Sequence, residues 1–94
     1  MTYPMSITFH CHPGDPVYVI DSYITDDGHI KYTIFRDRVY SASARVSGIY
    51  YETVNCADLT WMKTIFPDRS LAIKYATDNN LDFEEADGGI TDEN

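Results

Sequence analysis

The chain has 94 residues, enough for one small domain, and 44% of them are hydrophobic. Its formal net charge is −8, and seven of its fifteen acidic residues follow Lys74, the last basic residue. Because this negative end repels phosphate, the charge argues against direct binding of nucleic acid or of an anionic membrane, and it favours a partner protein with a basic surface.

The N-terminus has no basic region followed by an apolar run, and no stretch approaches the length of a membrane span. We therefore expect a cytoplasmic protein. Thiols stay reduced in that compartment, so Cys11 and Cys56 are expected to be free rather than bridged.

The first half of the chain is rich in strand signals. Residues 1–12 precede a Pro-Gly-Asp-Pro turn cluster and are expected to form an N-terminal extension. Residues 17–20 are a short apolar run typical of a strand, and an Asp-Asp-Gly turn follows at 26–28. Residues 29–46 alternate apolar and polar side chains, which predicts either one long bent strand or two strands that meet near Asp37.

The second half adds two strands and a helix. A Ser-Gly turn predicts a hairpin into a strand at residues 49–54, and residues 63–66 look like a last short strand. Asp68 is placed to cap a helix that ends near Asn79 and Asn80. The residues expected mostly in one core are Val17, Val19, Ile30, Tyr32, Ile34, Ile49, Tyr51, Ile65, Phe66 and Leu71.

Strands whose apolar face changes along their length are typical of small, coiled barrels. We therefore predict an α+β, β-rich domain at residues 13–80, built as a small barrel of about five strands with one C-terminal helix. Residues 81–94 then form an acidic tail in which Leu81 and Phe83 are isolated apolar residues.

The order of these pieces resembles a family of small phage and mobile-element proteins of Gram-positive bacteria. The resemblance covers about residues 13–77 and leaves out the N-terminal extension and the acidic tail. It implies an SH3-like barrel with a C-terminal helix, in a protein that acts on host or phage machinery inside the bacterial host cell. The matching residues are Gly14, Asp15, Val17, Tyr18, Val19 and Ile20, then Ile65, Phe66, Asp68, Ala72 and Ala76.

His10, Cys11 and His12 suggest a metal site completed by Cys56. However, consecutive residues of an extended chain point to opposite faces, so Cys11 does not easily join the two histidines, and zinc needs four ligands. The sequence also has no motif that would give a Cys–His pair an orienting third group or an oxyanion hole. We therefore expect a protein that is not an enzyme and that has no metal and no cofactor.

Arginines interleaved with tyrosines form a second pattern, which is open to RNA binding. An aspartate interrupts this pattern and the charge of the whole chain opposes it, so direct nucleic-acid binding is not favoured. The residues concerned are Arg36, Arg38 and Arg45 with Tyr32 and Tyr40, and the interrupting residue is Asp37.

The acidic end and the single tryptophan are the predicted partner-binding residues. Trp61 either caps the core or anchors a partner, because exposed Trp and Tyr dominate interface hot spots. The complete set is Asp78, Asp82, Phe83, Glu84, Glu85, Asp87 and Trp61.

Two functions follow from these observations, both without catalysis. The first is a phage or mobile-element protein that inhibits or redirects a host protein. Its acidic surface would mimic DNA in a basic groove, as in inhibitors of CRISPR or restriction enzymes. The alternative is a structural or adaptor module, with a homodimer through tyrosine-bearing strand edges as one form. Electrostatic mimicry weakens steeply with salt, whereas an apolar adaptor interface does not.

Overall fold

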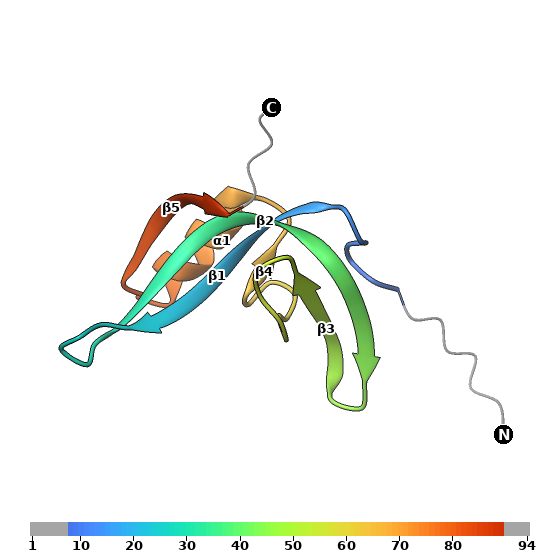
Figure 1. Ribbon diagram of the computed structural model, residues 1–94, viewed down its shortest axis with the longest axis horizontal. Helices are drawn as coiled ribbons and strands as arrows, with labels where there is room; N and C mark the ends of the chain where they lie inside the picture. The colour runs from blue at the N-terminus through green and yellow to red at the C-terminus, as the bar shows by residue number, and fades with distance from the viewer. Residues whose placement is uncertain (1–7, 90–94) are drawn as a thin grey trace, which may run out of the picture.

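An open, strongly bent sheet of five strands carries one helix on one of its faces (Figure 1). The computed structural model describes residues 8–89. Within this part of the chain, no helix is long and apolar enough to cross a membrane. In chain order the elements are β1 (Pro16–Ile24), β2 (Ile30–Arg45), β3 (Gly48–Thr53), β4 (Ile65–Phe66), α1 (Arg69–Asp78) and β5 (Phe83–Gly89).

Strand β2 holds the sheet together because three other strands pair with it. Its first part is antiparallel to β1, from Ile24 opposite Ile30 to Pro16 opposite Arg38. Its last part is antiparallel to β3, and β5 runs parallel to its first part on the other edge. Among the strands of residues 8–89, the short β4 pairs with β1 alone, so the main order is β3-β2-β1-β4.

The bend of β2 lies where it passes from β1 to β3, next to Asp37. This side chain is wholly buried, and its Oδ1 accepts the Arg38 main-chain N–H at 2.8 Å. Its Oδ2 accepts the main-chain N–H of Asn55 at 3.1 Å and the side-chain Nδ2 at 3.2 Å. The carboxylate therefore joins the bend of β2 to the turn that follows β3. Of the predicted stretch 29–46, residues Ile30–Arg45 accordingly form one long bent strand rather than two.

A β-bulge accompanies the bend. Val39 pairs with Thr53 and Ser41 pairs with Glu52, so Tyr40 is an extra residue that faces no partner. The bulge changes which side chains of β2 face the buried Tyr51 side of the sheet, from the odd-numbered Phe35 and Val39 before it to the even-numbered Ala42 after it. Figure 1 shows β2 curving over like an arch at this point.

The core is divided into two clusters, which corrects the expectation of one. Alternate residues of β1 face opposite sides of the sheet, and each side has its own cover: the loop after β3 on one side, α1 on the other. We call these the first and the second cluster. The first is Cys11, Val17, Val19, Val39, Tyr51, Leu59 and Ile65; the second is Ile20, Ile34, Phe66, Ala72 and Ala76.

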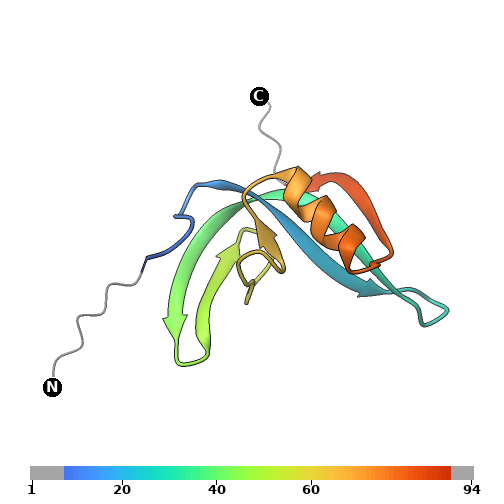
Figure 2. The ribbon, with the colours of Figure 1, turned by 180° about the vertical axis from the view of Figure 1, so that it is seen from behind.

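Helix α1 covers the second cluster and begins as the sequence predicts. The Asp68 carboxylate accepts the Leu71 main-chain N–H at 2.9 Å, which caps the helix. Ala72 and Ala76 lie on its buried side, where their small side chains let the helix approach the sheet closely. Figure 2 shows α1 lying across β1 and β2. The helix ends at Asp78, with Asn79 as its C-cap.

Four expectations need correction. The sheet is not closed, so the SH3-like barrel is not confirmed. The boundary at residue 80 is wrong, because β5 belongs to the sheet and Phe83 packs on the second cluster. Ile30 is 55% exposed rather than buried. The predicted N-terminal extension also joins the fold in part, since Phe9 and Cys11 contact the first cluster; residues 1–7 lie outside the described part of the chain.

We expect a chain cut after Asn80 to be clearly less stable than the full chain. The cut removes Leu81 and Phe83 from the second cluster and uncovers one edge of β2. Losing a fully buried aromatic side chain costs roughly 3–5 kcal/mol, and Phe83 is only half-buried, so we predict a loss of about 2–4 kcal/mol. Urea unfolding measures this loss. A chain ending at Gly89 is the control, and equal stability of the two truncated chains would contradict the assignment of β5 to the fold.

Candidate functional site

Strand β5 displays its acidic side chains on both faces of the sheet. Phe83 pairs with Tyr32 and packs on the second cluster, on the side of α1. Glu85 lies on this same side and forms a salt bridge with Arg69 of the helix. Glu84 points to the opposite side, where its Oε2 accepts the Tyr23 hydroxyl at 3.1 Å. The sequence alone could not assign these faces, because they depend on pairing with a distant strand.

The structure brings together only some of the predicted partner-binding residues. Asp82, exposed, leads directly into β5, and its main-chain carbonyl accepts the Tyr32 N–H at 2.8 Å. Asp78 lies apart at the end of α1, where its carboxylate is 2.6 Å from Lys74 Nζ. Asp87 belongs to β5, but its side chain lies outside the described part. Salt bridges thus already occupy two of these acids, Asp78 and Glu85.

The outer edge of β5 is open. Within residues 8–89, β5 pairs with β2 and with no other strand. An open edge presents main-chain N–H and C=O groups to which another extended chain can bind. Charged side chains on such an edge discourage pairing with a like-charged copy. The edge therefore favours a partner of opposite charge.

Trp61 lies at the rim of the first cluster, far along the chain from β5. It is half-buried, its ring is 6.0 Å from that of Tyr51, and it stacks on His10 at 4.8 Å with an angle of 5° between the planes. The neighbouring Met62 has a positive φ of 63°, which makes the tight turn that returns the chain to Ile65. Both predicted roles of Trp61 fit this place, since one face packs inward while part of the ring stays exposed.

A groove that the sequence did not predict lies between β1, the loop after β3 and the end of α1. Its volume is about 440 Å³. It opens because β4 covers only part of the edge of β1 and because α1 stops before the end of the β1–β2 hairpin. Neither boundary has a composition signal, which is why sequence reasoning missed the site. The lining residues used below are Asp21, Ser22, Tyr32, Lys63, Asn79 and Leu81.

The histidines and thiols do not form a shared site. The His10 ring stacks on Trp61, whereas His12 lies beside Asp15 with 3.9 Å between Nδ1 and Oδ2. Among the described residues, no three His, Cys, Asp or Glu side chains are placed to hold a metal ion. Both cysteines are free, and burial raises the pKa of Cys11 and of Cys56 to about 11.

No protein-family model matches the chain, and neither a curated protein nor a solved structure matches it. The resemblance to phage and mobile-element proteins therefore stays a prediction. What can be argued about function comes from the geometry of the strand edges, the groove and the charged side chains.

The two thiols should react slowly with iodoacetamide in the folded protein. The thiolate is the reactive form, and an ordinary cysteine with a pKa of about 8.5 is already partly ionised at pH 8. With a pKa of about 11, Cys11 and Cys56 stay protonated until the pH approaches that value. Mass spectrometry should show alkylation at least about fiftyfold slower than in urea at pH 8. It should also show a rate that still rises between pH 9 and 10; a plateau there would contradict the raised pKa values.

Proposed function

We propose that this protein is a non-catalytic binding module that engages the basic surface of a partner protein through the open edge of β5. The observation that carries the proposal is an uncovered strand edge with acidic side chains, on a chain of net charge −8. Opposite charge speeds encounter with a basic partner, and main-chain pairing at the edge supplies a directional contact.

The surroundings of the buried carboxylate and of the two thiols support a binding function rather than catalysis. Asp37, the wholly buried carboxylate of the described chain, already accepts three hydrogen bonds from N–H groups. Burial raises the pKa values of the two thiols and so disfavours the thiolate form, whereas a nucleophilic cysteine is activated by a lowered pKa. These groups therefore act in folding, and the exposed charges are left for recognition.

The resemblance noted in the sequence suggests the setting of this proposal. In a phage or mobile-element protein, the basic partner is a host nuclease of the CRISPR or restriction type. The acidic edge then occupies a groove that otherwise takes nucleic acid. This inhibitory role predicts that DNA and the protein compete for the nuclease.

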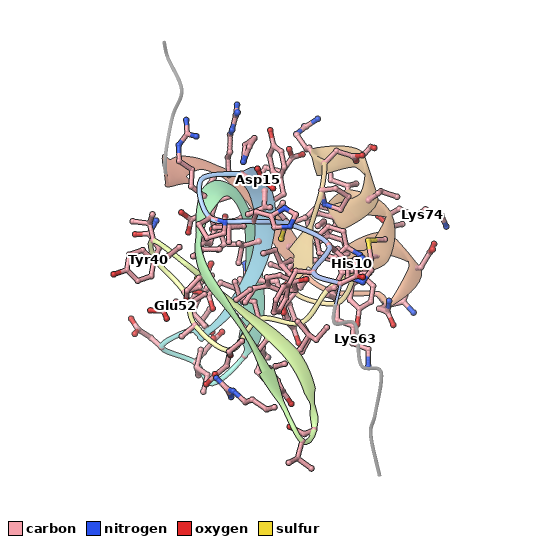
Figure 3. The ribbon with its side chains drawn as sticks, turned by 90° about the vertical axis from the view of Figure 1, so that its right-hand side faces the viewer. His10, Asp15, Tyr40, Glu52, Lys63 and Lys74 are labelled. Carbon is pink, nitrogen blue, oxygen red and sulfur yellow. The ribbon has the colours of Figure 1, made fainter. Side chains whose placement is uncertain are left out.

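A homodimeric adaptor is the second candidate, and one observation favours it. Tyr40 is 67% exposed in the bulge and Val54 is 55% exposed near it, on the arm formed by β2 and β3. Figure 3 shows Tyr40 and Glu52 on the opposite side of the molecule from His10 and Lys63. Aromatic and aliphatic side chains exposed together are typical of interfaces.

Charge reversal in β5 tests the proposal. Bacterial lysate is passed over the immobilised full chain, and retained proteins are quantified by mass spectrometry. We expect Glu84→Lys to weaken retention of the specific partner by about five- to tenfold at low salt. Asp26→Lys is the matched control, because it changes the net charge equally at the exposed β1–β2 turn.

The outcomes separate the candidates. Loss of retention with Glu84→Lys but not with Asp26→Lys, together with loss at high salt, supports recognition by β5. An equal loss of retention with both variants means that net charge alone explains the effect, and it contradicts the proposal. A dimer in light scattering that Tyr40→Ala dissociates, with retention insensitive to salt, favours the adaptor instead.

A further inference from the structure

Among residues 8–89, no strand pairs with the edge of β1 beyond the point where β4 ends. This uncovered part of β1 forms one wall of the groove. The Ile20 main-chain N–H donates to the Thr64 carbonyl at 2.9 Å, which is the last main-chain hydrogen bond along this edge within the described part of the chain. The chain on the β4 side then turns away, since the Thr64 N–H bonds back to Thr60 at 3.0 Å. Main-chain groups of alternate residues point the same way, so those of Ser22 and Ile24 face the opening. The Ser22 N–H already donates to the Asp21 carboxylate at 3.0 Å, so an added strand has to replace that hydrogen bond.

Apolar side chains continue past the groove on the same face of the hairpin. Ser22 pairs with Tyr32 in the groove, and the next pair on this face is Ile24 with Ile30. Ile24 is 72% exposed, and its partner Ile30 is exposed as well. Together with Leu81 they form an apolar strip that α1 is too short to cover.

We propose that this open edge of β1 binds an extended segment of a partner protein as an additional strand. The side chains of the bound segment that lie on the α1 side of the sheet are apolar and pack on Tyr32, Ile24 and Ile30. The side chains of the bound segment on the opposite side of the sheet are basic and contact Asp21. The site is separate from the β5 edge of the proposed function and stands or falls independently of it.

Charge complementarity identifies the occupant as basic. The exposed Asp21 carboxylate accepts only the Ser22 N–H, at 3.0 Å, and has no cationic partner within residues 8–89. Helix α1 ends at Asp78, its C-cap Asn79 lies beside the groove, and its last turn contains no basic residue to offset the negative end of the helix dipole. Lys63 lies on the loop side of the groove and opposes a cation there. The basic side chains therefore belong on the Asp21 side.

Titration with defined peptides tests the proposal on the full chain by amide NMR. The probe is a capped seven-residue peptide of alternating lysine and valine. One control peptide replaces lysine with glutamate, and another replaces valine with proline, which cannot form a strand ladder. We expect the lysine peptide alone to bind and to shift the amide signals of Ser22, Ile24 and Asn79.

Matched variants locate the contact. Both variants remove the isoleucine side chain, but Ile24→Pro also removes the outward N–H, which an edge position tolerates, while Ile24→Ala keeps that N–H. We expect Ile24→Pro to bind the lysine peptide about tenfold more weakly than Ile24→Ala. Asp21→Lys should weaken binding, and Lys63→Glu should strengthen it, by several-fold each.

Four results would overturn the proposal. One is that no lysine peptide binds, or that the glutamate peptide binds equally well. Another is equal affinity of Ile24→Pro and Ile24→Ala. A third is signal changes confined to β5 and abolished by Glu84→Lys, which would assign the peptide to the surface of the proposed function. The last is binding only after deletion of residues 2–7, which would make the N-terminal segment the occupant.

Discussion

The buried carboxylate of Asp37 is the interaction on which the rest of the structure depends. Burying a charged group is costly unless hydrogen bonds replace its water, and three N–H donors do so here. Two of them come from Asn55, so the bend of β2 is fixed to the turn after β3. The same strand can therefore pair with β1 before the bend and with β3 after it.

The bend also explains why the two proposed binding surfaces are strand edges. A strand that changes partner divides the core into two clusters with different covers, and the sheet stays open. One consequence is the acidic outer edge of β5, and the other is the edge of β1 beyond β4. Both edges expose main-chain groups, so in both proposals the charges beside the edge decide which partner binds. Acids dominate the first, and Asp21 and Lys63 stand at the second.

The local elements could be predicted from sequence, but their assembly could not. Alternation in residues 29–46 and the cap at Asp68 are signals within a few residues, and the structure confirms both. The pairing of β5 with β2 is not local, and an acidic segment ending in two glycines has no strand signal. The groove depends on where β4 ends, and exposure of Ile30 depends on the length of α1. Such boundaries are set by packing between distant segments.

A double-mutant cycle between Asp37 and Asn55 tests the central claim most directly. The free energy of unfolding is measured in urea for Asp37→Ala, Asn55→Ala and the double variant. If the carboxylate joins the two halves, Asp37→Ala costs at least about 3 kcal/mol and the coupling energy is about 1–2 kcal/mol. Additive effects, within about 0.4 kcal/mol, and a loss below about 1 kcal/mol for Asp37→Ala would contradict the account.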